Sequence, residues 1–175
     1  MATNAPCART KILVAIDDSK PAQWAMQVAS AFAKRMNAEV ILVSVIPTPM
    51  PVVAEAVFYE TESAWRDRLQ EEASMLLCNA RDSLPPTVPC ETVVREGDAP
   101  IEIVDLARAK NVNLIVLGSR GRNRFSQFVL GSTAEAVLRK AHCPVMTVAN
   151  EPVRCASASA QSERVCCGKA AAASK

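Results

Sequence analysis

The chain has 175 residues, of which 50% are hydrophobic and 22% are charged, and its formal net charge is +2. This length suits one compact domain, and the apolar content argues against global disorder. The surplus positive charge falls in residues 151–175, so residues 1–150 are neutral overall. A neutral domain argues against nucleic-acid binding, which usually requires a basic one.

No apolar run approaches the ~20 residues that a membrane-spanning helix needs. The first residues, MATNAPCARTK, lack the apolar core of a signal peptide. We therefore expect a soluble, cytoplasmic protein with no membrane partner.

Five short apolar runs predict β-strands. Near-continuous Val, Ile and Leu indicate strands buried on both faces, as in a parallel sheet. The third run, CETVVRE, is more polar and is predicted to lie at an edge. The predicted strands span residues 11–16, 39–45, 90–96, 113–118 and 144–149.

Four helical patterns separate these runs, with apolar residues recurring every three or four positions. Their predicted ranges are 20–36, 61–83, 99–110 and 132–141. Ser19 and Asp98 are predicted N-caps. The predicted inward faces carry, in chain order, Ala22, Ala25, Ala29, Phe32, Ala33, Met36, Trp65, Leu69, Ala73, Leu76, Ala80, Ile101, Val104, Ala107 or Arg108, Val137, Leu138 and Ala141.

The alternation of strand and helix predicts an α/β fold: an open, doubly wound five-stranded parallel sheet in the order 3-2-1-4-5, with helices on both faces. A long proline-rich connection, residues 46–60, follows the second strand. Residues 151–175 are rich in Ala, Ser and Cys, so we expect one domain over 1–150 and a flexible tail over 151–175.

The seven cysteines form no CxxC pair, and we interpret most of them as small buried hydrophobic residues. Cys166 and Cys167 are interpreted as a tail pair of no set role, although oxidation or acylation would also suit them. With a single histidine and dispersed cysteines, no metal cluster is predicted.

The segment GSRGRNRFSQFVLGST, residues 118–133, holds three of the five glycines. It fits neither common glycine-rich phosphate motif. In the predicted strand order, a ligand crevice forms between the first and fourth strands, where Asp17 and Gly118 end their strands. Glycine there permits close backbone approach or a positive φ.

Two interpretations of the last helix start are equally compatible with the spacing. Free N–H groups of Gly131, Ser132 and Thr133 would face an anion at the helix N-terminus. Ser132 with Glu135 also matches a capping box, which requires no ligand. Both interpretations can hold together, because one cap leaves other N–H groups free.

The spacing of this segment, G-2x-G-9x-G-S, resembles the ATP-binding signature of the universal stress protein family. The resemblance covers residues about 10 to 149 and includes Asp17-Asp18-Ser19 and HCPVMTV. It implies the adenine nucleotide alpha hydrolase-like fold and membership of the ATP-binding branch. It also implies ATP as ligand, with Mg²⁺ held only through the phosphates.

The resemblance further implies roles for individual residues. Asp17 would lie near the ribose or a metal-bound water, and Val45 would contact the adenine. Family members typically dimerise through the last strand, here Val145 to Ala149. The remaining implied nucleotide-binding residues are Ala15 and Ile16 beside the adenosine, Leu117 and Gly118 on the base and ribose side, and Gly121, Gly131, Ser132 and Thr133 at the phosphates.

The arginines of the loop depart from the family pattern. We expect Arg120 to face the phosphates and interpret Arg122 and Arg124 as exposed. His142 is interpreted as structural, since a helix C-terminus favours histidine. No catalytic residue is predicted.

The sequence thus predicts a nucleotide-binding dimeric sensor or switch in the stress response. Two alternatives stay open: a slow ATPase in the same crevice, and a ligand-independent chaperone-like dimeric scaffold.

Overall fold

A computed structural model of the chain describes residues 9–48, 62–119 and 130–152. The predicted tail lies outside them from residue 153 on. The elements follow the order β1 (Lys11–Ala15), α1 (Lys20–Met36), β2 (Glu39–Ile46), α2 (Glu62–Asp82), β3 (Cys90–Glu96), α3 (Ala99–Ala109), β4 (Leu114–Gly118), α4 (Ser132–Lys140) and β5 (Val145–Val148).

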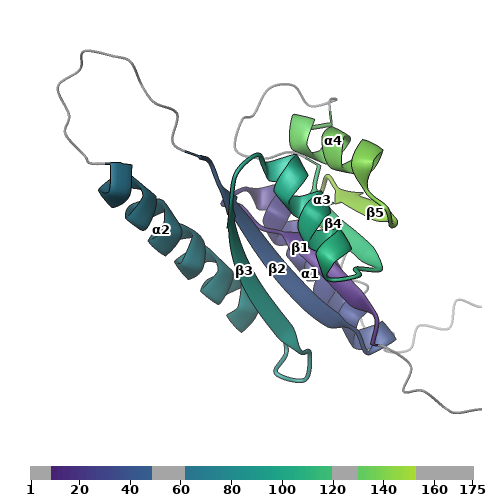
Figure 1. Ribbon diagram of the computed structural model, residues 1–175. Coiled ribbons are helices and arrows are strands. Elements are labelled where there is room, and N and C mark those ends of the chain that lie inside the picture. Colours follow the sequence, from purple (N-terminus) through teal and green to yellow (C-terminus); the bar gives the residue numbers. More distant parts are fainter. Residues whose placement is uncertain (1–8, 49–61, 120–129, 153–175) are drawn as a thin grey trace, which may run out of the picture.

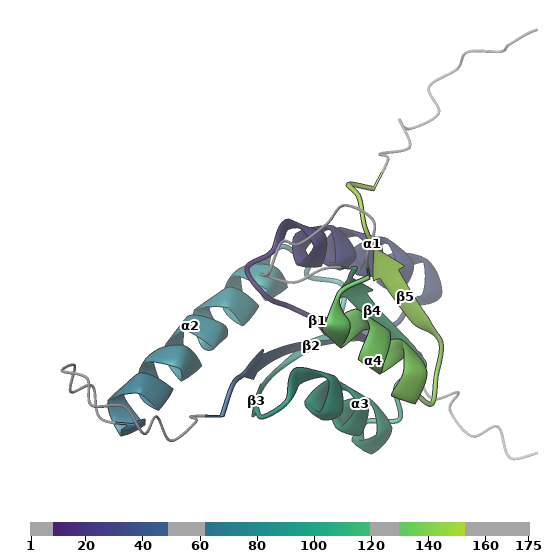
Figure 2. The ribbon, with the colours of Figure 1, turned by 90° about the horizontal axis from the view of Figure 1, so that it is seen from above.

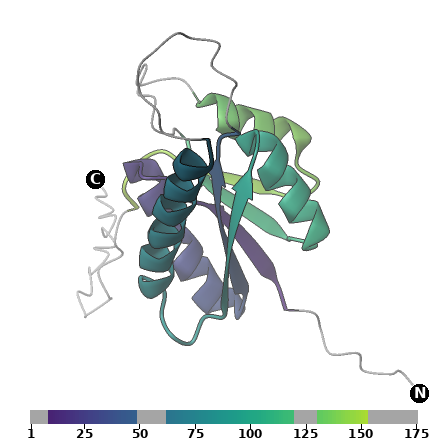
Figure 3. The same ribbon diagram turned by 60° about the vertical axis from the view of Figure 1, so that its left-hand side comes forward.

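The strands form one parallel sheet in the order β3-β2-β1-β4-β5, which confirms the predicted topology and the edge position of β3. Helices α1 and α2 cover one face of the sheet, and α3 and α4 cover the other (Figures 1 and 2). Figure 3 shows α2 running along β2 and β3. The fold is therefore the doubly wound α/β sandwich that the alternating pattern predicts.

Two apolar clusters, one on each face, hold the layers together. Ala25 and Ala29 of α1 and Leu77 of α2 pack on one face of the sheet. Ile103 of α3 and Val137 of α4 pack on the other. Because the central strands contribute to both clusters, they are buried on both faces, which is why they are near-continuous runs of Val, Ile and Leu.

For four residues the prediction that the side chain lies in the core is wrong. Phe32 is 38% exposed, Met36 50%, Ile101 44% and Leu138 52%. The small alanines of α1 let that helix lie close to the sheet, so only a narrow stripe is covered and residues at its border stay in solvent. In α3 the buried stripe instead includes Ile103 and Leu106, together with the predicted Val104 and Ala107.

The cysteines also differ from the prediction. Cys78 is exposed, and Cys90 and Cys143 are only half-buried against the two clusters. In residues 9–48, 62–119 and 130–152, no helix is long and apolar enough to cross a bilayer.

Candidate functional site

A cavity of about 590 Å³ opens at the carboxyl ends of β1, β2 and β4. This volume lies in the range of about 300–1,000 Å³ typical of small-molecule sites. Nine of the eleven predicted site residues line it: Ala15, Ile16, Asp17, Val45, Leu117, Gly118, Gly131, Ser132 and Thr133. The other two, Arg120 and Gly121, lie outside the described residues, as do Arg122 and Arg124.

Strand ends and helix starts meet here because parallel strands all finish at the same edge. Asp17 lies in the turn between β1 and α1. Its Oδ1 atom accepts hydrogen bonds from the backbone N–H of Ser19 (3.1 Å) and from the Ser19 hydroxyl. The Ser19 hydroxyl in turn accepts from the N–H of Ala22 (3.3 Å), which confirms Ser19 as the N-cap of α1.

Gly118 is required for packing. A Cβ atom at this position would lie 2.8 Å from the carbonyl carbon of Pro21 and 2.9 Å from the nitrogen of Ala22. The first turn of α1 thus rests directly on the end of β4. Of the two alternatives considered for this glycine, a positive φ is not adopted; the close backbone approach that the structure shows is to α1.

The predicted capping box at the start of α4 is also wrong. Gly131 is the N-cap, with ordinary extended dihedrals, and Ser132 is already the first helical residue. Without a serine at the cap, the reciprocal bonds of the box cannot form. Glu135 instead accepts a 2.6 Å hydrogen bond from Arg139 one turn later.

Three donors remain at this helix start. The N–H of Gly131 was predicted to face an anion, but it donates to the carbonyl of Ser119 (2.7 Å) and is therefore not available. The N–H groups of Ser132, Thr133 and Ala134 precede the first intrahelical bond and have no partner among the described residues. The positive end of the helix dipole adds to their attraction for an anion.

The sequence reasoning missed several lining residues: Ala22, Val43, Pro47, Ala99, Ile103, Ser119 and Ala134. Val43 could have been predicted, because it lies two residues before Val45 and strand alternation places both side chains on the same face of the sheet. Ala99 and Ile103 reach the cavity only because α3 crosses this face of the sheet, which no local pattern reveals.

Charge is sparse in this cavity. Among the described lining residues Asp17 alone carries a formal charge. The described ranges contain no cluster of three or more His, Cys, Asp or Glu side chains able to hold a metal ion. His142 is exposed beyond the end of α4 and does not line the cavity.

Comparison with known proteins places this geometry in a family. The model of the universal stress protein family matches residues 8–149. A universal stress protein of Methanocaldococcus jannaschii is 32% identical over 142 residues, which cover 79% of this chain and 81% of that protein. Another from Bacillus subtilis is 31% identical, with 79% and 97% covered.

Solved structures agree in fold. A hypothetical protein whose biochemical function was assigned from its structure has a TM-score of 0.71 at 30% identity, covering 82% of this chain and 98% of that one. Two universal stress proteins, one described in complex with cAMP and one from Archaeoglobus fulgidus in complex with dAMP, have TM-scores of 0.61 and 0.55. They cover 83% and 79% of this chain and 100% and 97% of their own. At 21% identity each, these two show the fold alone.

Proposed function

Because the chain belongs to the universal stress protein family, we propose that the cavity at its strand ends binds an adenine nucleotide, with ATP as the first candidate. One observation carries the proposal: the cavity of about 590 Å³ ends on three N–H groups at the start of α4 that have no partner in residues 9–48, 62–119 and 130–152. A cavity with an apolar part and a cluster of donors at one end suits a flat base joined to a polyanion.

The apolar part of the cavity suits the base. Val45 and Leu117 line it from two strands, and Ile103 lines it from α3. In the proposed pose the adenine contacts Val45, and the ribose lies near Asp17. A carboxylate can accept hydrogen bonds from ribose hydroxyls. Since Oδ1 of Asp17 already accepts two bonds from Ser19, the other carboxylate oxygen would take this role.

The polar end suits the phosphates. Ser132 and Thr133 offer backbone N–H groups and hydroxyls at the positive end of α4. In the proposed pose they hold the phosphate chain, together with Gly121 and Arg120. ATP would supply the anionic oxygens for these donors, and any Mg²⁺ would be held through the phosphates.

The choice of adenine draws on fold-level likeness. Two relatives of this fold are described in complex with cAMP and dAMP, which share an adenine base. The residues of this cavity fit a purine by size and polarity, and the distinction between adenine and guanine is part of the test.

We propose binding without rapid hydrolysis. Hydrolysis requires a general base placed on the attacking water. Asp17 is the one ionised group among the described lining residues, and one of its oxygens is already engaged by Ser19. Single-turnover phosphate release would test this point, and a burst at the rate of binding would favour an ATPase.

The first experiment is ligand-dependent thermal stability. A ligand that binds only the native state at 100 times its Kd stabilises it by about 2.7 kcal/mol. ATP should therefore raise the Tm of the purified chain, and GTP should raise it less. If millimolar ATP leaves the Tm unchanged, the proposal fails.

A matched pair of variants locates the effect. Val45 and Val93 are both half-buried on the same face of the sheet, and of the two only Val45 lines the cavity. Val45→Thr should weaken ATP binding several-fold, because it places a hydroxyl against the base. Val93→Thr should leave ATP affinity unchanged, although both variants lose some stability.

We further propose that the protein acts as a dimeric sensor or switch in the stress response and dimerises through β5. This strand is an edge of the sheet. The carbonyl of Pro144 accepts from the N–H of Ile115 in β4, and that of Val148 from Ser119 directly after β4. The alternation of a parallel ladder therefore directs the N–H of Thr147 outward. Thr147→Pro removes that donor at an edge, where proline is tolerated. Light scattering should then give the monomer mass, and an unchanged mass would discard this interface.

A further inference from the structure

Ser119 is a buried polar residue at the polar end of the cavity. It directly follows β4, lines the cavity and is only 7% exposed. Its N–H donates to the carbonyl of Val148 (2.8 Å), and its carbonyl accepts from the N–H of Gly131 (2.7 Å). These two bonds fix its backbone between the end of β5 and the start of α4.

The hydroxyl of Ser119 has no hydrogen-bond partner among the residues that the structure describes. Its Oγ atom is buried, and no described group donates to it or accepts from it. Native proteins pair nearly all buried polar atoms, because an unpaired one costs the free energy of its lost hydration. An unpaired hydroxyl in the wall of a ligand cavity therefore points to a partner that arrives with the ligand.

The groups around the Ser119 hydroxyl are hydrogen-bond donors, which suit an oxyanion as the partner. Gly131, which bonds to Ser119, is the N-cap of α4, and the next three N–H groups are unpartnered among the described residues. A hydroxyl has one proton to donate, and the described residues of this wall supply neutral donors without a cation. The Ser119 hydroxyl and these N–H groups can therefore donate together to one anion.

We propose that Ser119 is a ligand-binding residue whose hydroxyl donates to a phosphoryl oxygen held at the start of α4. This inference rests on the proposed nucleotide site and adds to it the residue that distinguishes a phosphorylated ligand from the bare nucleoside. Without a ligand the hydroxyl has no partner in the described part of the chain; in the complex it completes the donor set formed by Ser132 and Thr133.

A structural role for the hydroxyl leads to different expectations. If Ser119 only served packing, Ser119→Ala would lower the Tm of the ligand-free protein and weaken every ligand alike. With the role proposed here, the ligand-free Tm should stay unchanged or rise, because the variant removes an unpaired buried hydroxyl. The affinity for ATP should fall about 10-fold or more, and the affinity for adenosine should stay the same.

Ser44 provides a matched control. It is also a serine with 7% exposure. It lies on β2 between Val43 and Val45, which both line the cavity, so strand alternation directs its side chain to the opposite face of the sheet. Ser44→Ala should leave the affinities for ATP and adenosine unchanged.

The experiment measures binding of ATP, adenosine and inorganic tripolyphosphate to the wild type, Ser119→Ala and Ser44→Ala by calorimetry, with the ligand-free Tm of each. The inference is supported if Ser119→Ala alone loses affinity for ATP and tripolyphosphate and keeps adenosine. Equal ATP affinity in the wild type and Ser119→Ala overturns it and leaves the nucleotide site standing. A parallel loss for ATP and adenosine with a lower Tm also overturns it.

Two further outcomes separate this inference from the proposed function. If tripolyphosphate binds the wild type and requires Ser119 while ATP and adenosine do not bind, the oxyanion role stands and the nucleotide assignment falls. If none of the three ligands binds the wild type, both proposals are overturned.

Discussion

The cavity at the carboxyl ends of the strands and a second one at the amino end of β3 have similar volumes, about 590 Å³ and about 620 Å³. The second cavity lies where the connection after α2 enters β3. Its wall includes Leu84 and Cys90 and three prolines, residues 85, 86 and 89. Proline has no N–H, so this wall is poor in backbone donors, whereas the first cavity ends on the unpartnered donors of α4.

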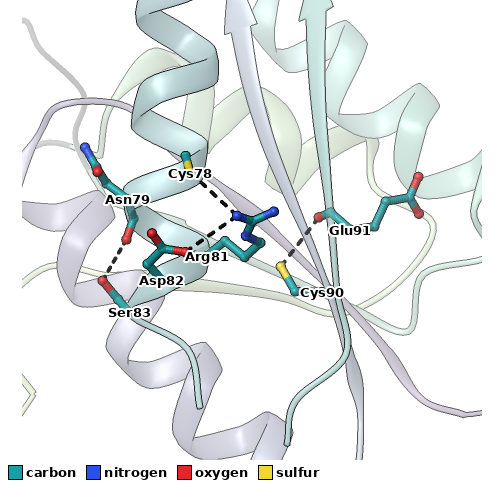
Figure 4. A network of polar contacts seen from close by, with 7 residues as sticks. All are labelled: Cys78, Asn79, Arg81, Asp82, Ser83, Cys90 and Glu91. Carbon is teal, nitrogen blue, oxygen red and sulfur yellow. Dashed lines mark hydrogen bonds and ion pairs between the residues drawn. The ribbon is translucent and has the colours of Figure 1, made fainter. Parts of the chain in front are cut away.

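Polar side chains around the second cavity interact with one another (Figure 4). The Nη2 atom of Arg81 lies 3.6 Å from the Cys78 sulfur and 3.6 Å from Oδ1 of Asp82. The Cys90 thiol donates weakly to the carbonyl of Glu91 (3.7 Å). Because these groups already have partners, a ligand would have to displace existing contacts.

The difference teaches that cavity size alone does not identify a site in this fold. What distinguishes the first cavity is a set of N–H donors that none of the described residues satisfies, in a position where a helix dipole adds to their attraction for an anion. The second cavity is better explained as the place where the end of α2 packs against the sheet edge. The following predictions test this contrast.

The largest effect is expected for Gly118→Val, at the wall of the first cavity. The new side chain would meet the backbone of Pro21 and Ala22 at 2.8–2.9 Å, and backbone cannot yield as a flexible side chain can. We expect a loss of about 3 kcal/mol or more in the free energy of unfolding, measured by urea denaturation.

Gly131→Ala is the matched control for this glycine. The φ of Gly131 is −63°, which any residue adopts. Its cost should stay below about 1 kcal/mol, the usual loss when alanine replaces a favourable N-cap. Equal losses in the two variants would contradict the packing role assigned to Gly118.

Leu84→Ala tests the second cavity. Leu84 lines that cavity and is nearly buried in the apolar cluster that joins α1 and α2 to the sheet. Truncation should cost about 2 kcal/mol, at the low end for a core leucine because the site already borders open space. The affinity for ATP should not change; a several-fold loss would show that the two ends of the sheet are coupled.

The contrast between the two ends also marks what the sequence could predict. The strands and helices were predictable because a parallel sheet imposes continuous apolar runs and its crossovers impose helical periodicity. The nine cavity-lining residues were found through the family spacing and the strand order. Gly118 lines the cavity as predicted, but its close packing against Pro21 could not be predicted, because Pro21 lies far away in the sequence.

Other features of the site could not be predicted from local sequence patterns. The capping box failed because α4 begins one residue earlier than the motif requires, at Ser132, which leaves Gly131 as the N-cap. The role of Ser119 could not be predicted, because a serine whose hydroxyl lacks a partner cannot be told from any other serine in a sequence. Whether a hydroxyl is satisfied depends on tertiary contacts, which only the three-dimensional arrangement gives.

A smaller effect concerns pH at the second cavity. Burial raises the pKa of Cys90 from 9.0 to about 11, although Arg81 opposes the shift. The folded state thus holds the thiol proton more tightly than the unfolded chain. Below pH 9 the thiol makes its full contribution to the free energy of unfolding. As the pH rises to about 11 this contribution falls by about 1 kcal/mol, after allowing for partial solvent screening.

The measurement is urea denaturation of the wild type and Cys90→Ala at several pH values between 8 and 11. Other groups titrate in both proteins, so the difference between their slopes isolates Cys90. The wild type should lose its advantage over the variant as pH rises. If the free energy of unfolding changes equally with pH in the two proteins, the folded state holds the thiol proton no more tightly than the unfolded chain does.

The smallest effect separates stability from binding at the first cavity. Glu135 lies in the first turn of α4 and pairs with Arg139 four residues later, at 2.6 Å on the helix surface. Glu135→Gln removes this exposed pair and the favourable carboxylate at the helix start, each worth about 0.5 kcal/mol. Stability should therefore fall slightly.

ATP affinity should change in the opposite direction. The same carboxylate lies within one turn of the donors proposed to hold the phosphates, so its removal reduces repulsion of an anion. We expect a rise of up to about threefold at low salt that disappears at high ionic strength, because exposed charges are screened. Asp105→Asn, which breaks the exposed pair with Arg108 on α3, should cost similar stability without changing ATP affinity. A gain in both variants would indicate a response to net charge alone and would not support an anion site at α4.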